Sequence, residues 1–358
     1  MARKDISKNS RGPLKLKPIK NQVAVVFGAS SGIGRQTAID LARRGAKVVA
    51  AARSEPGLAS LVDEIEDDGG DAFYVTADAA DFEQVNAVAE SAFERHGRID
   101  TWIHTAGVAL FARFEECTPE EFKQVVEVNL LGQVHGAMAA LPFIKRSSGG
   151  ALIHVSSVEA YRTLPFQAAY GASKHGIKGF LQALRLELQR DGAPIVVTEI
   201  MPSAINTPIW DKGRNKFDDK VRPPMWPIYA PKVVADAILY SAENPVREMV
   251  AGGTGIGVPL AERISPRFGD AMTRLVGFYQ FENEPEPAER SDSLFGPVPH
   301  FDTVEGRFSD EQITRDPYAW IRTHPKTAFT LAAAAGGALV ALLFQSPNRK
   351  KTAAAFRS

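Results

Sequence analysis

The sequence of 358 residues contains one cysteine, Cys117, so no disulfide can form within the chain. A single free thiol is typical of a protein that works in a reducing compartment. Cys117 has no recognisable histidine partner, which argues against catalysis by the thiol. The seven histidines lack the spacing of metal ligands, so we expect no metal site.

The chain has no excess of charge of either sign. Its 42 basic residues balance 42 acidic residues, so the composition does not indicate a nucleic-acid partner. The basic residues 1–20 are an exception, but no apolar core follows them, which excludes a secretory signal peptide. We expect a disordered basic arm there, with attraction to an anionic surface as the alternative.

From Gln22 onward, apolar runs typical of buried strands alternate with helical patterns. Examples are VAVVFG at Val23–Gly28 and APIVVTEIMP at 193–202, with one long helix expected at about 119–145. Repeated strand–helix units predict an α/β fold, a doubly wound parallel sheet with helices on both faces, or Rossmann fold. Ligands of such sheets bind at the carboxyl ends of the strands.

A glycine-rich turn, GASSGIG, follows the first predicted strand and precedes a helix. Gly28 permits a tight turn, Gly32 lets a pyrophosphate approach the backbone, and Gly34 lets helix and strand pack closely. The hydroxyls of Ser30 and Ser31 add hydrogen-bond donors. In this context the turn predicts a dinucleotide site.

The end of the second strand indicates which dinucleotide binds. An enzyme that uses NAD would place an Asp near Ala52, to bind the ribose 2′-hydroxyl. Arg53 follows instead, and a guanidinium without that carboxylate favours the 2′-phosphate of NADP(H) over NAD(H). The alternative is an arginine that merely ends the strand.

A third pattern contains side chains suited to proton transfer. The apolar strand Ala151–Val155 ends in Ser156 and Ser157, and Tyr170 and Lys174 follow on one helix face at i, i+4 spacing. A fixed positive charge near a tyrosine favours its phenolate and suits it to proton transfer. A serine hydroxyl at the strand end could hold a carbonyl oxygen beside the phenol.

Together, GASSGIG, VNLLG, Ser157, YGASK and PSAINT occur in order and resemble the short-chain dehydrogenase/reductase family over about residues 21–252. The resemblance implies that Tyr170 is the catalytic acid or base, that Lys174 lowers its pKa, and that Ser157 orients the substrate oxygen. It implies that Asn129 kinks its helix and holds a water. The implied cofactor contacts are Gly28, Ser30, Ser31, Gly32, Ile33, Gly34, Arg53, Asp78, Ala79, Ala106, Gly107, Asn129, Tyr170, Lys174, Pro202 and Thr207.

The sequence departs from the family pattern at two turns. His104-Thr105-Ala106-Gly107 replaces Asn-Asn-Ala-Gly, so we expect altered hydrogen bonding at the sheet end with cofactor binding retained. Ser203 replaces the glycine of the late Pro-Gly motif. The family also suggests a homodimer through helices at 119–145 and 168–190.

The C-terminal part has no counterpart in short members of the family. Residues 253–326 are expected to form an extension, with helices within 259–278 beside the substrate cleft and an irregular linker at 281–317. The uncharged run 327–344 would be about 27 Å long as a helix, close to a bilayer core. We expect a membrane anchor with the catalytic domain in the cytosol and a basic tail at 345–358. The alternative is a docked helix on a soluble cytoplasmic protein.

The function predicted is an NADP(H)-dependent oxidoreductase that interconverts a carbonyl and an alcohol. Aromatic residues in 203–230, including Trp210 and Trp226, favour a bulky apolar substrate, unless they only anchor this segment to the core. A membrane-tethered scaffold that binds NADP(H) without turnover is the alternative from another class. Epimerase or dehydratase chemistry on the same fold is a third, less favoured alternative.

Overall fold

A computed structural model describes residues 14–217, 224–277, 291–324 and 327–330. The chain divides into two compact units, the first ending at Asp316 and the second beginning at Pro317. The first unit contains the sheet and both pockets described below. The second contains the short helix α11 (Pro317–Thr323).

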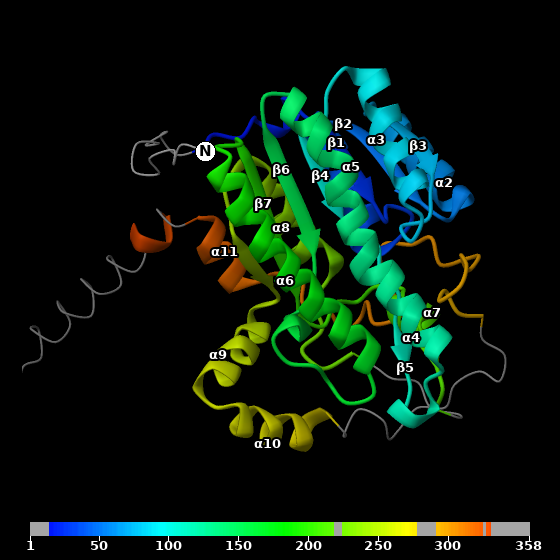
Figure 1. Cartoon of the computed structure of the whole chain (residues 1–358), viewed down its shortest axis with the longest axis vertical. Coiled ribbons are helices and arrows are strands. Elements are labelled where there is room, and N and C mark those ends of the chain that lie inside the picture. Colours follow the sequence, from blue (N-terminus) through cyan, green and yellow to red (C-terminus); the bar gives the residue numbers. More distant parts are fainter. Residues whose placement is uncertain (1–13, 218–223, 278–290, 325–326, 331–358) are drawn as a thin grey trace, which may run out of the picture. The chain divides into compact units, whose positions relative to one another are not determined.

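In the described part of the chain, seven parallel strands form the main sheet, in the order β3-β2-β1-β4-β6-β7-β9 (Figure 1). The strands are β1 (Val23–Phe27), β2 (Lys47–Ala52), β3 (Asp71–Thr76), β4 (Thr101–His104), β6 (Gly150–Val155), β7 (Ile195–Pro202) and β9 (Glu248–Ala251). The order reverses between β1 and β4, which creates the switch point where such sheets bind ligands. The predicted doubly wound parallel sheet is confirmed.

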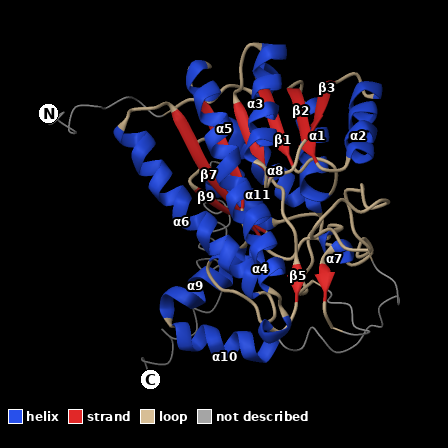
Figure 2. Ribbon diagram, turned by 45° about the vertical axis from the view of Figure 1, so that its right-hand side comes forward, coloured by secondary structure: helices blue, strands red, loops and turns tan. Residues whose placement is uncertain are grey.

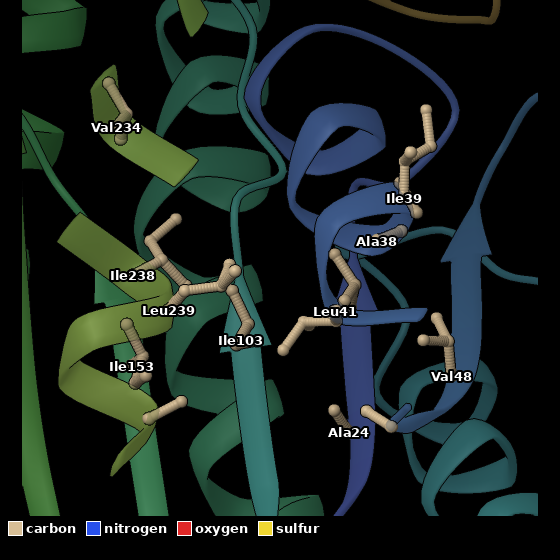
Figure 3. Close-up of a cluster of buried hydrophobic side chains, with 14 of the residues drawn as sticks. Ala24, Ala38, Ile39, Leu41, Val48, Ile103, Ile153, Val234, Ile238 and Leu239 are labelled. Carbon is tan, nitrogen blue, oxygen red and sulfur yellow. The ribbon is translucent and has the colours of Figure 1, made fainter. Parts of the chain in front are cut away.

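Helices cover both faces of the sheet (Figure 2). They are α1 (Gly32–Arg43), α2 (Glu55–Asp67), α3 (Phe82–His96), α5 (Gly132–Arg146), α6 (Ala168–Arg190) and α8 (Pro231–Glu243). Helices α1, α2 and α8 pack on one face of the sheet, and helices α3, α5 and α6 pack on the other. Figure 3 shows the first of these cores, with Leu41 of α1 and Ile238 of α8 beside Ile103 and Ile153 of the strands. Each such side chain is fully or almost fully buried, which contributes about 1.5–3 kcal/mol.

The sequence encodes where these helices begin. Asp81 caps α3 by accepting a hydrogen bond from the backbone of Gln84. Thr118 and Glu121 form a reciprocal capping box at the start of α4 (Pro119–Val126). The single helix predicted at 119–145 is instead α4, a π-helical turn at Glu127–Leu131 and then α5. A residue inserted into the helical ladder in this way redirects the chain.

The C-terminal extension belongs to the same compact unit as the sheet as far as Asp316. It begins with α9 (Gly257–Ile264) and α10 (Pro266–Gly277), which agree with the helices predicted within 259–278. The interpretation of 281–317 as a linker is corrected for residues 291–316. These pack on the domain: Leu294 is fully buried, and the Ile313 backbone pairs with Ile228 and Ala230 at 2.7 and 3.0 Å.

The amino-terminal arm also differs from the prediction where it is described. Leu16 and Ile19 are buried, and the Lys17 ammonium lies 2.7 Å from the buried carboxylate of Asp100. Residues 14–20 are therefore ordered, because apolar side chains alternate with the lysines and find a place on the core. Residues 1–13 lie outside the described part.

Among the described residues, no helix combines the length and the apolar character that crossing a bilayer requires. Most of the predicted membrane helix, residues 331–344, and the basic tail at 345–358 lie outside the described residues. The membrane anchor therefore stays a prediction.

Candidate active site

A pocket with a cavity volume of about 160 Å³ opens at the carboxyl ends of β1 and β2, where the glycine turn begins α1. Gly28 has a φ of +92°, and a Cβ there would lie 2.5 Å from the backbone nitrogen of Ala106. A Cβ at Gly34 would collide with the carbonyl oxygen of Gly28. Thr105 Oγ1 donates to the carbonyl of Phe27 at 2.9 Å and closes the turn. Only glycine fits these two positions of the turn.

Most residues predicted to hold the cofactor line this pocket. They are Gly28, Ser30, Ser31, Gly32, Ile33, Gly34, Arg53, Asp78, Ala79, Ala106, Gly107 and Thr207. Pro202 is buried at the end of β7 and does not line it, and neither do Asn129, Tyr170 or Lys174. Of the residues predicted to be catalytic, Ser157 and Tyr170 line a second pocket instead.

Arg53 is one of the cations that line the first pocket. Its Nη2 donates to the carbonyl of Ser293 at 2.7 Å, while Nη1 is buried without a hydrogen-bond partner, 3.9 Å from Asp78 Oδ2. Burial lowers the pKa of Arg53, and the Asp78 carboxylate opposes that shift. A buried donor left without an acceptor costs about 1–3 kcal/mol. Together with the glycine turn, this donor makes the pocket fit a nicotinamide dinucleotide.

The second pocket has a cavity volume of about 440 Å³ and adjoins the first, since Ile209 lines both. Its polar wall carries Ser157, Glu159 and Tyr170. Much of the remaining lining is apolar and includes Phe111, Val158, Ile209, Trp210, Met225, Trp226, Val258, Phe268 and Met272. The segment predicted to cover the substrate thus contributes Trp210 and Trp226, whereas Phe217 packs on Phe166 with ring centroids 5.0 Å apart.

Helices α9 and α10 form one side of this second pocket, beyond the carboxyl end of the sheet (Figure 1). Arg162 fixes their position: it lies 2.8 Å from Glu262 of α9 and also pairs with Asp270 of α10. A mostly buried guanidinium with two carboxylates is held in one geometry. The extension is therefore a structural part of the pocket.

The proposed catalytic groups meet at the end of β6. Ser157 Oγ accepts a hydrogen bond from the Glu159 backbone at 3.1 Å, and the Ser157 hydroxyl also forms a hydrogen bond with Tyr170. Lys174 is buried, its Nζ donates to the Val155 carbonyl at 3.3 Å, and it lies 5.2 Å from the centre of the Tyr170 ring. The predicted i, i+4 pair lies on α6 beside this serine.

The electrostatics of these groups differ from the expectation. Burial, then the Glu159 carboxylate, raise the pKa of Tyr170, and a hydrogen bond with Ser157 opposes the shift. Burial lowers the pKa of Lys174 to about 8, against the carboxylates of Glu159 and Glu199. The net shift of the Tyr170 pKa is therefore upward, and the lowering expected from Lys174 stays a prediction. The reasons for the upward shift are burial of Tyr170 and the Glu159 carboxylate, which the sequence reasoning overlooked.

Asn129 lies within the π-helical turn and is fully buried. Its Oδ1 accepts from the Val108 nitrogen at 2.8 Å, and its Nδ2 donates to the Val108 carbonyl at 3.0 Å. The irregularity predicted at Asn129 is present, and this pair of hydrogen bonds ties it to the chain after β4. Its role toward a water stays a prediction.

His104 replaces an asparagine of the family pattern and is fully buried in β4. Its ring stacks on Phe27 at 4.9 Å, and burial lowers its pKa well below the usual value. Neither ring nitrogen has a hydrogen-bond partner among the described residues. Thr105 donates hydrogen bonds at this sheet end to the carbonyls of Phe27 and Gly28.

Sequence reasoning missed several residues of the first pocket. Lys212 and the extension residues Ser293, Pro297, Val298 and Asp302 all line it. Residues 291–303, which we call the strap, carry no motif that links them to a turn more than 250 residues earlier. Lys212 could have been suspected from the sequence, because it is a basic residue only five positions after Thr207, which was predicted to contact the cofactor.

Comparison with known proteins agrees with this geometry. The model of the short chain dehydrogenase family matches residues 22–217, so the chain belongs to this family and is an NAD(P)-dependent oxidoreductase of that type. It is 38% identical over 281 residues to "uncharacterized oxidoreductase YxnA" of Bacillus subtilis, covering 78% of this chain and 79% of that protein.

Two solved structures are similar to this chain. An alcohol dehydrogenase of Thermococcus sibiricus, complexed with 5-hydroxy-NADP, has 28% identity and a TM-score of 0.56, with 64% of this chain and 95% of that chain covered. A short chain dehydrogenase/reductase of Burkholderia phymatum in complex with NAD has a TM-score of 0.64, and the match covers 76% of this chain and 100% of that chain. At 22% identity, the second shows the fold alone.

Proposed function

We propose that the protein interconverts a carbonyl and an alcohol on a bulky apolar substrate, with NADP(H) as the hydride carrier. The observation that carries this proposal is that Ser157 and Tyr170 together line a large, mainly apolar pocket. That pocket adjoins the dinucleotide pocket through Ile209. A carbonyl beside Ser157 would face both the proton donor and the cofactor.

The residues would divide the reaction as follows. Ser157 donates a hydrogen bond to the carbonyl oxygen and orients it. A nicotinamide cofactor bound in the adjoining pocket would supply the hydride for the carbonyl carbon. Tyr170 gives its phenolic proton to the developing alkoxide oxygen, and its raised pKa keeps the phenol protonated as the donor for reduction. Lys174 stabilises negative charge on the phenol oxygen after the transfer, while the pocket excludes water.

Arg53 supports NADP(H) as the cofactor. Its buried Nη1 needs an acceptor, and a 2′-phosphate would supply one with a full negative charge. Ala52 offers no carboxylate for a ribose hydroxyl. The complex of the Thermococcus sibiricus enzyme with an NADP derivative is consistent with this choice.

A panel of methyl ketones of increasing chain length tests the function. With NADPH, kcat/KM is expected to rise about fourfold per added methylene, because each buried methylene contributes about 0.8 kcal/mol. NADH in the same assay should support slower reduction. The rate is followed as oxidation of the reduced nicotinamide. A flat response to chain length, or a preference for small hydrophilic carbonyls, would contradict the proposal.

We also propose that residues 327–344 anchor the enzyme to a membrane, with the catalytic unit in the cytosol. The support is an uncharged run of eighteen residues flanked by basic residues. Full-length protein should remain in the membrane pellet after a carbonate wash, whereas a truncation ending at Pro325 should be released. Release of both proteins would reject the anchor and favour a soluble protein.

A further inference from the structure

A cation that the mechanism does not use lies in the cofactor pocket. Lys212 ends the short helix α7 (Ile209–Lys212), and its Nζ donates to Ser31 Oγ of the glycine turn at 2.8 Å. The Lys212 carbonyl accepts from both the nitrogen and the hydroxyl of Ser293, at 2.8 and 3.0 Å. The side chain is thus held between the glycine turn and the strap.

The charges around Lys212 come from three different segments. Burial lowers the pKa of Lys212 to about 8. Asp302 of the strap opposes this shift, Arg53 after β2 adds to it, and Asp211 of α7 also opposes it. Two cations that repel each other while largely withdrawn from water are costly unless an anion lies between them. In this structure Asp302 of the strap and Asp211 act on Lys212, and the Asp78 carboxylate lies 3.9 Å from Arg53 Nη1.

The strap also places an acceptor at the start of each of two helices in the pocket. The Thr303 carbonyl accepts from the Gly32 nitrogen, the first residue of α1, at 2.8 Å. The Asp302 carboxylate lies where a Cβ on Gly57 would be, in the first turn of α2. Helix N-termini are sites where anions bind. Asp302 therefore occupies a position suited to a phosphate of the cofactor.

We propose that Lys212 and Arg53 form a cationic clamp for the 2′-phosphate of NADP(H), and that Asp302 faces this clamp until the phosphate replaces it. The proposal rests on the cofactor named under the proposed function and adds the residues that select it. Ser31 orients Lys212 toward the clamp, and Ser293 holds Arg53. Asp302 then reduces affinity for the phosphate, while Lys212 increases it.

Calorimetry with two cofactor fragments tests the clamp without any turnover. Full-length protein is titrated with adenosine 2′,5′-bisphosphate and with adenosine 5′-monophosphate, which differ only in the 2′-phosphate. Lys212→Met should weaken binding of the bisphosphate roughly 10- to 100-fold and that of the monophosphate less than about threefold. Asp302→Asn should tighten binding of the bisphosphate about three- to tenfold and leave the monophosphate unchanged.

Asp302→Asn keeps both cations and nearly the same shape, so it decides the question even if Lys212→Met fails to fold. Weaker bisphosphate binding by Asp302→Asn would overturn the proposal and indicate a carboxylate that binds a ribose hydroxyl. Equal losses for both fragments in Lys212→Met, or no loss, would also overturn it. Because neither fragment carries nicotinamide, these results are independent of whether the protein reduces ketones.

Discussion

Tyr170→Phe is expected to lower kcat for NADPH-dependent ketone reduction by about 10²- to 10⁴-fold at pH 7. The substitution keeps the ring that packs in the second pocket and removes only the proton that would pass to the alkoxide. Binding of NADPH should change little, because Tyr170 does not line the dinucleotide pocket. Steady-state rates on the best ketone of the panel, with coenzyme affinity measured by nicotinamide fluorescence, give both quantities.

Tyr240→Phe provides the matched control. Tyr240 lies on α8, which covers the opposite side of the sheet from α6, and the change again removes one hydroxyl. Its rate should stay within about twofold of the wild type, as for a substitution away from the site. If Tyr170→Phe keeps more than a tenth of the wild-type kcat, the phenol is not the proton donor.

Gly34→Ala is expected to have the largest effect on the cofactor pocket. The added methyl group would collide with the Gly28 carbonyl and come within 2.6 Å of Thr105 Oγ1, and neither turn nor helix can move alone. Overpacking of this kind costs roughly 1–3 kcal/mol and should lower the unfolding midpoint by about 3–10 °C. NADPH affinity should fall by more than about tenfold, because the turn that approaches the pyrophosphate is displaced.

Gly179→Ala is the corresponding control on α6. A Cβ at Gly179 meets no atom within 4 Å, so the substitution should stabilise the helix by about 0.5–1 kcal/mol. Calorimetric unfolding of both variants, with and without NADPH, measures the change in stability and the change in NADPH affinity for each. Unchanged NADPH affinity in Gly34→Ala would mean that the close approach of turn and helix is not needed for binding.

The sequence predicts best what depends on neighbouring residues. The glycine turn, the strand ends and the Tyr170–Lys174 pair are local patterns, and each was placed correctly relative to its strand or helix. The sequence predicted only a kink at Asn129, not a π-helical turn. The helix is irregular there because Asn129 forms two hydrogen bonds with Val108, 21 residues earlier, and no local pattern encodes that contact.

The remaining differences arise from contacts that no local pattern encodes. The strap reaches Arg53 through a carbonyl 240 residues away, so its irregular sequence resembled that of a linker. Glu159 was overlooked because a carboxylate two residues after the serine belongs to no motif. Its effect on the pKa of Tyr170 depends on burial that only the packed pocket creates.

The strap also has a consequence for the order of assembly. The glycine turn and β2 lie in the first sixty residues. The strands of the main sheet from β1 to β7 can pair once residue 202 has been synthesised. One wall of the dinucleotide pocket, however, is formed by Ser293, Pro297, Val298 and Asp302. During synthesis, which proceeds from the amino terminus, the sheet can therefore form well before this wall exists. The contact between the strap and Arg53 closes a loop of 240 residues. It is expected to form late, because the entropy lost on closing the loop must be offset by the contacts that the strap makes. A nascent chain would acquire its fold first and a complete cofactor pocket only after residues 291–303 have been synthesised.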